Sequence, residues 1–308
     1  MEIALQFVLL ALGFLMLGKG ADWFVEGAAG IAMRFGIPQL VIGLTIVAMG
    51  TSAPEAAVSI AAAVKGNADI TIGNIVGSNI LNILVILGLA ASIVPIAVAR
   101  STVRIEMPFM IAITALLFYQ GRDGSISLAD GGVLMVAFAA YMMYLYTMAM
   151  KSNVDSDLEE PGLPLGRCLL GAVGGLALII AGSNVTVGAA TSIATYAGLS
   201  ERFIGLTIVA LGTSLPELFT SVAAARRGNA DIAIGNIVGS NIFNILFVVG
   251  LSSLIIDIPF ASAFNFDTYV ALGAAVLLWL CVLRTQRLQR WAGALMLVCY
   301  AAYLGHIL

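Results

Sequence analysis

Two glutamates stand out because each lies deep inside an apolar stretch of the chain. Glu55 ends the sequence GTSAPE and Glu217 ends the sequence GTSLPE. A carboxylate at the centre of a bilayer costs about 2.5–3.5 kcal/mol even on a lenient insertion scale. Neither glutamate has a lysine or arginine within one helical turn to offset this cost. We therefore expect both carboxylates to bind a cation; the alternative is a pair of protonated, hydrogen-bonded structural acids.

The residues just before each glutamate predict a break in its helix. Pro54 and Pro216 cannot donate a backbone hydrogen bond to the carbonyls of Gly50 and Gly212, four residues earlier. Broken backbone at membrane depth is tolerated where it lines a cavity, so carbonyl oxygens are expected to face the site. The same turns also carry four hydroxyl groups, on Thr51, Ser52, Thr213 and Ser214.

A second repeated motif is expected to form the opposite wall of the site. The sequences GNIVGSNILN and GNIVGSNIFN begin at Gly73 and Gly235. Polar residues recur at every fourth position and so share one face of an apolar helix: Asn74, Ser78 and Asn82, then Asn236, Ser240 and Asn244. Asn79 and Asn241 lie off this face, and we expect them to hydrogen-bond to neighbouring backbone rather than to bind a cation.

All of these candidate ligands are oxygen atoms, from carboxylates, amides, hydroxyls and carbonyls. The two repeated segments contain neither histidine nor cysteine. Oxygen ligands suit hard cations such as Na⁺ and Ca²⁺ and disfavour Zn²⁺ or copper. Two carboxylates neutralise one Ca²⁺, whereas Mg²⁺ is less well suited because it keeps its waters and a strict octahedron.

The two motifs belong to a long internal repeat. Residues 43–89 and 205–251 match at a constant offset of 162, with 34 identities in 47 positions. The matches include proline, glutamate, aspartate and four pairs of asparagine, so the apolar composition does not explain them. The repeat indicates two copies of one functional device.

The composition predicts a membrane protein. Hydrophobic residues make up 61% of the chain and charged residues 10%, and the net charge is −3. Soluble domains contain roughly 45–50% apolar and 25% charged residues. Apolar runs of about 20 residues recur along the sequence, which is the signal for membrane-spanning helices. No run of lysine or arginine predicts nucleic-acid binding.

We predict an all-α polytopic membrane protein with ten transmembrane helices in two inverted five-helix repeats. The spans lie near 3–32, 38–64, 70–94, 107–118, 131–150, 166–196, 203–225, 231–256, 268–283 and 291–307. The first repeat occupies residues 1–150, a cytoplasmic linker 151–165, and the second repeat 166–308. An odd number of spans per repeat inverts the second copy, and inverted repeats place substrate sites near the bilayer midplane.

Basic residues predict the orientation of the chain. With the N-terminus outside, ten basic residues fall on the inside and three on the outside, as the positive-inside rule expects. The inside set is Arg34, Arg100, Arg104, Lys151, Arg167, Arg226, Arg227, Arg284, Arg287 and Arg290, and the outside set is Lys65, Arg122 and Arg202. We therefore expect a multi-pass cell (inner) membrane protein with both termini outside and the linker in the cytoplasm.

Two further groups of charged residues, in the first span and in the linker, have simple structural interpretations. Lys19, Asp22 and Glu26 share one face of the first span, which predicts a local ion pair facing a vestibule; a role in ion access is the alternative. The acids of the linker alternate like the start of an EF-hand loop. However, Glu160 stands where such a loop needs glycine, so we expect a solvated linker.

The sequence resembles the calcium/cation antiporter superfamily, and most of all its prokaryotic sodium/calcium exchanger branch. The resemblance rests on two GTSxPE motifs, each followed by GNxxGSNxxN, and on GADWFV in the first span. It covers nearly the whole chain. It implies antiport of Na⁺ and Ca²⁺ without a cofactor, by a protein that functions as a monomer in the lipid bilayer.

The resemblance also implies a ligand set for four central cation sites. Glu55 and Glu217 would be the central carboxylates. The other ligands would be Thr51, Ser52, Ser78, Asn82, Thr213, Ser214, Ser240, Asn244 and the carbonyls of Ala48 and Ala210. The first and sixth helices would slide over the other eight to alternate access between the two sides.

One residue departs from the family pattern. Well-known relatives have an acid where this chain has Asn244, so potassium dependence is not expected. Proton/calcium relatives resemble GNxxE in this helix, whereas this chain has Gly77-Ser78 and Gly239-Ser240 there and no acid, which makes proton/calcium antiport the second interpretation. A cation channel is a remote alternative, and an intramembrane enzyme a weaker one because no nucleophile–base pair is visible.

Overall fold

The structure, a computed structural model, describes residues 2–66, 68–152, 163–198 and 210–307. In these ranges the regular secondary structure is helical apart from four two-residue strands. Most of the predicted linker 151–165, Arg202 and the start of the second repeated segment, 205–209, lie outside the described residues.

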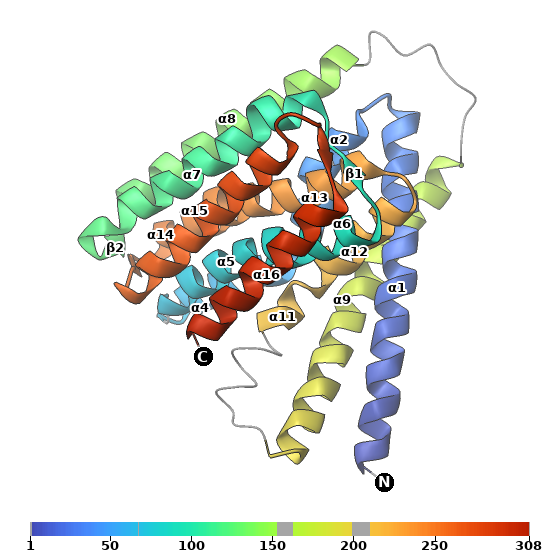
Figure 1. Cartoon of the computed structure of the whole chain (residues 1–308), viewed down its shortest axis with the longest axis horizontal. Coiled ribbons are helices and arrows are strands. Elements are labelled where there is room, and N and C mark those ends of the chain that lie inside the picture. The colour runs from blue at the N-terminus through green and yellow to red at the C-terminus, as the bar shows by residue number, and fades with distance from the viewer. Residues whose placement is uncertain (1, 67, 153–162, 199–209, 308) are drawn as a thin grey trace.

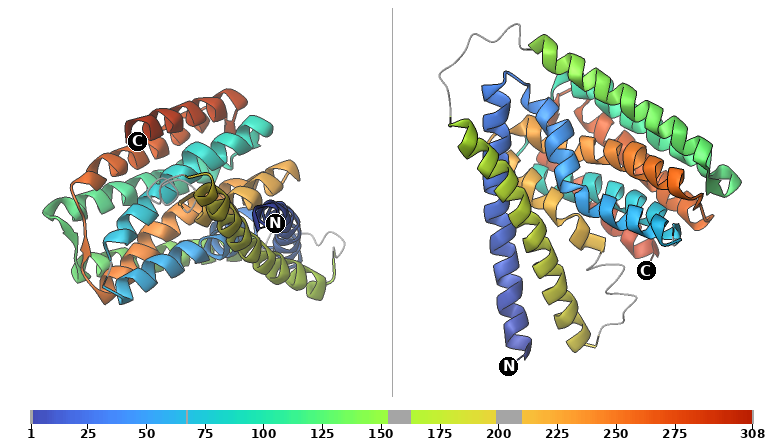
Figure 2. Two further views of the ribbon diagram at one scale, coloured as in Figure 1. Left: turned by 90° about the horizontal axis from the view of Figure 1, so that it is seen from below. Right: turned by 180° about the vertical axis from the view of Figure 1, so that it is seen from behind.

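Two long helices lie side by side and extend beyond the rest of the molecule (Figures 1 and 2). They are α1 (Glu2–Arg34) and α9 (Leu165–Tyr196), with 33 and 32 residues. At 1.5 Å per residue each is about 50 Å long, so both must tilt in a hydrocarbon core of about 30 Å. Their outer faces expose large apolar side chains such as Leu15 and Leu170, which suits contact with lipid.

Glycines let these two helices touch backbone to backbone. Gly13, Gly20 and Gly27 recur every seven residues along α1 and face α9. A Cβ added at Gly27 would lie 2.4 Å from the amide nitrogen of Ala172 and 2.5 Å from the carbonyl oxygen of Cys168. Close packing through small residues is a main source of helix association in membranes.

We predict that Gly27→Leu separates α1 from α9 and lowers the melting temperature of the purified protein. The clash is with backbone, which cannot rotate away, so the cost should reach or exceed the roughly 1–3 kcal/mol of ordinary overpacking. Gly18→Leu is the matched control, because nothing lies within 4 Å of a Cβ at that position. Equal melting temperatures for the two variants would contradict this description of the helix pair.

The helix that carries Glu55 is broken where the sequence predicts. The segments α2 (Gln39–Ile42), η1 (Gly43–Val47) and α3 (Ala48–Thr51) form one rod, and α4 (Ala53–Val64) continues at an angle of 51°. Ser52 lies between them with φ −81° and ψ 6°. In the second half, Ser214 occupies the same place, with φ −90° and ψ 3°, between α11 (Ala210–Thr213) and α12 (Leu215–Arg226).

Two buried helices form the centre of the molecule. One comprises α5 (Asp69–Leu81), η2 (Asn82–Leu87) and α6 (Gly88–Ile93), and the other α13 (Ala230–Phe243), η6 (Asn244–Val249) and α14 (Gly250–Ile255). The segments η2 and η6 are π-helical and begin at Asn82 and Asn244. Such wide turns are rare and are frequent at functional sites, and the apolar pattern did not predict them.

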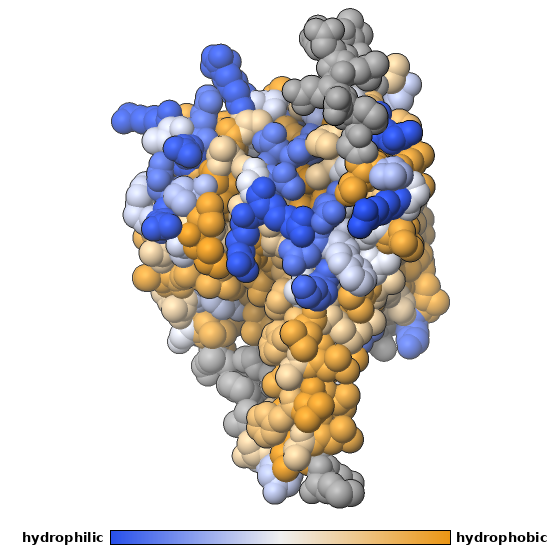
Figure 3. All heavy atoms as spheres, turned by 90° about the vertical axis from the view of Figure 1, so that its right-hand side faces the viewer, coloured by the Kyte–Doolittle hydropathy of each residue, from blue (hydrophilic) through white to orange (hydrophobic). Residues whose placement is uncertain are grey.

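The remaining helices pack around this centre. They are η3 (Thr102–Glu106) with α7 (Met107–Gln120) and η4 (Gly121–Asp123), then α8 (Leu128–Ser152), α15 (Ala263–Val282) and α16 (Arg290–Ile307). The start of α1 and the end of α16 lie on the opposite side of the molecule from the end of α8 and the start of α9 (Figure 1). On the face over α1, hydrophilic residues gather in the upper half and hydrophobic residues below (Figure 3).

The short strands join the two halves of the chain at two places. Strand β1 (Ile96–Ala97) pairs antiparallel with β4 (Arg287–Leu288), and β2 (Ser125–Ile126) pairs antiparallel with β3 (Ile258–Pro259). The registers match Ile96 with Leu288 and Ile126 with Ile258. Adding 162 to 96 and to 126 gives 258 and 288, so the two pairings are related by the same offset as the sequence repeat.

Within the described residues, seven helices are long and apolar enough to cross a membrane, or eight if the bent pair around Ser52 is one span. The chain is therefore a helical multi-pass membrane protein. Two of the ten predicted spans are not among these helices. The span 203–225 begins outside the described residues, and the span 291–307 corresponds to helix α16.

Candidate cation site

The two broken helices bring Glu55 and Glu217 together at the centre of the molecule. Each glutamate has only 1% of its surface exposed. The Ser52 hydroxyl donates a hydrogen bond of 2.7 Å to Oε1 of Glu217. The Ser214 hydroxyl donates one of 3.3 Å to Oε1 of Glu55. Each carboxylate is therefore held by the broken turn of the opposite half.

Four buried oxygens, on the broken helices and on the central helices that contact them, have no hydrogen-bond donor in the described structure. They are Oε2 of Glu55, Oε2 of Glu217, Oδ1 of Asn82 and Oδ1 of Asn244. The four form two pairs at the offset of 162, as 55 with 217 and 82 with 244. Leaving a buried acceptor unsatisfied costs about 1–3 kcal/mol, and more for a charged group. A set of such acceptors suits a bound cation, which satisfies them all at once.

The other hydroxyl groups predicted at the site belong to Thr51, Thr213, Ser78 and Ser240. Thr51 is buried and donates to Oδ1 of Asn236 at 2.9 Å, which ties a broken turn of the first half to α13 of the second. Ser78 and Ser240 are also buried, and the Ser240 hydroxyl lies 3.4 Å from the carbonyl oxygen of Ala48. Thr213 is half-buried at the end of α11.

The roles of the two predicted carbonyl ligands, Ala48 and Ala210, stay predictions. The Ala48 carbonyl also accepts the backbone N–H of Ser52 at 3.0 Å, which leaves its role as a cation ligand a prediction. Ala210 is the first described residue of α11, and its role also stays a prediction.

Asn74 and Asn236 hold the glutamate-bearing helices against the central helices. The Asn74 amide donates to the hydroxyl of Ser59 at 2.9 Å and to the carbonyl of Glu55 at 3.3 Å. The Asn236 amide makes the equivalent contacts with Ser221 at 2.9 Å and with the carbonyl of Glu217 at 3.4 Å. These amides therefore fix the backbone of both glutamates, a role that the spacing of the polar face did not predict.

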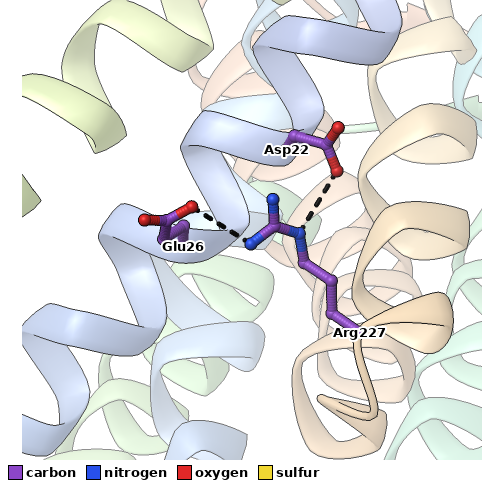
Figure 4. A network of polar contacts seen from close by, with 3 residues as sticks. All are labelled: Asp22, Glu26 and Arg227. Atoms are coloured by element: carbon purple, nitrogen blue, oxygen red, sulfur yellow. Dashed lines mark hydrogen bonds and ion pairs between the residues drawn. The ribbon is translucent and has the colours of Figure 1, made fainter.

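The charged face of α1 pairs across the fold rather than along its own helix. Arg227, just after α12, donates from Nε to Asp22 at 3.2 Å and from Nη1 to Glu26 at 3.1 Å (Figure 4). The expected local ion pair is thus replaced by a long-range one, because Arg227 reaches both acids from a separate helix. A cavity of about 490 Å³ lies beside it between α1 and α12, lined by Lys19 and Phe219 among others. The contacts tie α1 to the end of the second broken helix.

Sequence reasoning missed a buried carboxylate at the start of α7. Glu106 has no exposed surface and accepts a hydrogen bond from the hydroxyl of Tyr144. A similar pair occurs in the second half, where Tyr303 donates to Asp267 at 2.8 Å. The sequence did carry a signal for these pairs. An acid is followed by a tyrosine 38 residues later in the first half and 36 residues later in the second. Neither pair lies in the repeated motifs.

Comparison with known proteins gives one consistent family. The family model described as sodium/calcium exchanger protein matches residues 5–147 and 168–308. The sodium/calcium exchanger MaX1 of Methanosarcina acetivorans is 33% identical over 98% of both chains. The inner membrane protein YrbG of Escherichia coli is 40% identical over 80% of this chain and 79% of its own.

Solved structures lead to the same family. A structure of the sodium-calcium exchanger NCX_Mj matches with a TM-score of 0.87 and 33% identity, and the match covers 99% of this chain and 100% of that one. The family and its structural neighbours are transporters and not enzymes, as the sequence predicts. This chain therefore belongs to the sodium/calcium exchanger family, as a prokaryotic member of the calcium/cation antiporter superfamily.

Proposed function

We propose that this protein exchanges Na⁺ for Ca²⁺ across the membrane by alternating access. The observation that carries the proposal is the set of four buried, unpaired oxygens from Glu55, Glu217, Asn82 and Asn244. Two carboxylates balance the charge of one Ca²⁺ or of two Na⁺. Because both ions need the same carboxylates, they cannot occupy the centre together. Exchange follows from this exclusion.

The proposed architecture is ten transmembrane helices in two inverted repeats, residues 1–150 and 166–308, joined by a linker at 151–165. The strand pairings support it, because they obey the offset of 162 outside the repeated motifs. The crossed contacts of Ser52 and Ser214 support it as well. One chain supplies both carboxylates, so we propose that the functional unit in the bilayer is a monomer.

The proposed orientation has both termini outside and the linker in the cytoplasm. The excess of basic residues on the linker side supports this orientation. It places Arg227 and its partners Asp22 and Glu26 toward the cytoplasm, and Lys65, 162 positions before Arg227, toward the outside. The ion pairs in Figure 4 would then be on the cytoplasmic side of the site.

Access is proposed to alternate by movement of α1 and α9 as one body. Backbone contact along the glycines of α1 favours joint movement of the two helices. The site itself lies mainly on the broken helices and the central helices, which remain packed together. A bundle that moves around a fixed site is the common form of alternating access.

Flux measurement in proteoliposomes tests the proposed function. The purified chain would be reconstituted and ⁴⁵Ca²⁺ uptake followed with an outward Na⁺ gradient, with a pH gradient of the same size, and with neither. Na⁺/Ca²⁺ antiport predicts uptake only with the Na⁺ gradient. Uptake driven by pH alone would indicate proton/calcium antiport, and uptake with no counter-ion would indicate a channel.

A stoichiometry of three Na⁺ for one Ca²⁺, which the resemblance to the exchanger family suggests, predicts voltage dependence. One net charge would cross in each cycle and gain about 2.3 kcal/mol per 100 mV. Ca²⁺ flux should therefore change when a potassium diffusion potential is imposed with valinomycin at a constant Na⁺ gradient. A flux that is independent of voltage in sealed vesicles would rule out this stoichiometry.

A further inference from the structure

Four asparagines from both halves of the chain form a connected set of hydrogen bonds on the two central helices, which we term the asparagine cluster. Its members are Asn79, Asn82, Asn241 and Asn244, and all four are buried. Asn82 donates from Nδ2 to Oδ1 of Asn241 at 2.9 Å, and Asn244 donates from Nδ2 to Oδ1 of Asn79 at 3.1 Å. Asn79 donates to the backbone carbonyl of Asn241 at 3.2 Å, and Asn241 donates to that of Asn79 at 3.3 Å.

An asparagine side chain can bind a cation with only one of its two ends. The oxygen attracts a cation, whereas the NH₂ group can only donate hydrogen bonds and repels it. Rotating the amide by 180° would exchange the two ends with little change in shape. An asparagine in a cation site therefore needs a neighbour that fixes its orientation.

The asparagine cluster fixes this orientation through two successive contacts. A backbone carbonyl can only accept a hydrogen bond, so the carbonyl of Asn241 forces the NH₂ group of Asn79 toward itself. The oxygen of Asn79 then faces Asn244 and accepts its NH₂ group. This leaves Oδ1 of Asn244 free for a cation, in agreement with its lack of a donor. The same order of contacts runs from the carbonyl of Asn79 through Asn241 to Asn82.

We propose that Asn79 and Asn241 are positioning residues of the cation site: Asn79 orients the amide of Asn244, and Asn241 orients the amide of Asn82. The proposal rests on the proposed function, in which Asn82 and Asn244 bind the transported cation. Both polar ends of Asn79 and Asn241 are already used, one by a carbonyl and one by a ligand amide. They therefore act through their neighbours rather than as ligands.

The contacts cross between the halves of the chain. Each ligand is oriented by the asparagine of the opposite half, 159 positions away for Asn82 and 165 for Asn244. Correct orientation on one side of the site thus depends on close packing between the two central helices. The wide turns of η2 and η6 begin at the two oriented residues.

Double-mutant cycles on the full-length chain test the proposal, with ⁴⁵Ca²⁺ equilibrium binding as the readout. Asn241→Ala should weaken Ca²⁺ binding about 3- to 10-fold, the range of one net hydrogen bond. A carboxylate has two equivalent oxygens and no wrong orientation. In an Asn82→Asp background, Asn241→Ala should therefore not weaken Ca²⁺ binding, because a carboxylate has no NH₂ group to donate to Oδ1 of Asn241. The difference between the two backgrounds is a coupling of the size expected for contacting residues.

The same cycle on the other half gives a matched control. Asn244→Asp should not rescue Asn241→Ala, because Asn241 orients Asn82. Asn244→Asp should restore Ca²⁺ binding in Asn79→Ala, whereas Asn82→Asp should not. A purely structural role of either asparagine would reduce binding equally in every background. Asn241→Leu and Asn79→Leu repeat the cycles with the side-chain volume retained, in case the alanine variants are unstable.

The results separate this proposal from the proposed function. Equal losses in the wild-type, Asn82→Asp and Asn244→Asp backgrounds would overturn the positioning role, as would loss of binding that neither aspartate rescues. A wild-type protein that binds Ca²⁺ but shows no Na⁺-driven flux would overturn antiport and leave the positioning role standing. A wild-type protein that binds neither Ca²⁺ nor Na⁺ would overturn both.

Discussion

Glu55→Gln and Glu217→Gln are each expected to abolish Ca²⁺ transport while the protein still folds. Glutamine keeps the shape of the side chain and can still accept the hydrogen bond from Ser214 or Ser52. It removes one of the two negative charges that balance Ca²⁺. Two unit charges 4 Å apart interact by about 4 kcal/mol at an effective dielectric constant of 20. Losing this attraction should weaken Ca²⁺ binding by at least about 100-fold.

Transport of ⁴⁵Ca²⁺ and equilibrium binding would be measured for both variants, with size-exclusion profiles and melting temperatures to confirm folding. Glu106→Gln is the matched control, because Glu106 is a buried glutamate outside the site that pairs with Tyr144. Its Ca²⁺ affinity should equal that of the wild type. Normal transport by both single variants would show that the site is elsewhere.

Asn244→Asp is expected to shift the site strongly toward Ca²⁺. The oxygen of Asn244 is buried and has no hydrogen-bond donor, and in the proposed site the substitution adds a third negative charge to the cation shell. A third carboxylate attracts a divalent cation more than a monovalent one and raises the self-repulsion of the empty site. We expect Ca²⁺ to bind about 10- to 100-fold more tightly than in the wild type at high pH.

The added repulsion also predicts a steeper loss of Ca²⁺ binding as the pH falls, because protons compete for the third carboxylate. The measurement is Ca²⁺ and Na⁺ affinity against pH for the wild type and Asn244→Asp. Asn82→Asp is the matched comparison at the equivalent position of the first half. Unchanged ion preference and pH profile in Asn244→Asp would show that position 244 is not in the cation shell.

Local sequence predicted the broken helix and the burial of the two glutamates. Pro54 with Gly50 predicted a broken helix, and the helix bends by 51° at the adjacent Ser52. Glu55 and Glu217 are buried at the centre, as apolar surroundings without a nearby base indicated. These predictions succeeded because each depends on covalent constraints or on the cost of burying charge, both of which are local.

The contacts between the halves could not be predicted in the same way. Spacing along one helix shows which side chains share a face, but not what that face meets. Ser52 belongs to the same motif as Glu55, yet its hydroxyl contacts Glu217, 165 positions away. Asn79 was expected to bond to neighbouring backbone, and the backbone it reaches belongs to the other half.

Two other features of the structure could not be predicted from the sequence, for physical reasons. The π-helical turns at Asn82 and Asn244 add one residue per turn over a short stretch, and an almost wholly apolar sequence carries no pattern that such a change would disturb. Arg227 satisfies Asp22 and Glu26 from a separate helix (Figure 4). No rule of helix spacing links residues that lie about 200 positions apart.

Competition between Na⁺ and Ca²⁺ for the purified protein tests the central claim most directly, since the claim is that both ions share Glu55 and Glu217. Equilibrium binding of ⁴⁵Ca²⁺ would be measured at increasing Na⁺ with ionic strength held constant by choline. A shared site predicts that Na⁺ lowers the apparent affinity for Ca²⁺, while the number of Ca²⁺ ions bound at saturation stays the same. The affinity should fall more steeply than in proportion to the Na⁺ concentration. Ca²⁺ binding that Na⁺ leaves unchanged, or a reduced number of sites at unchanged affinity, would contradict it.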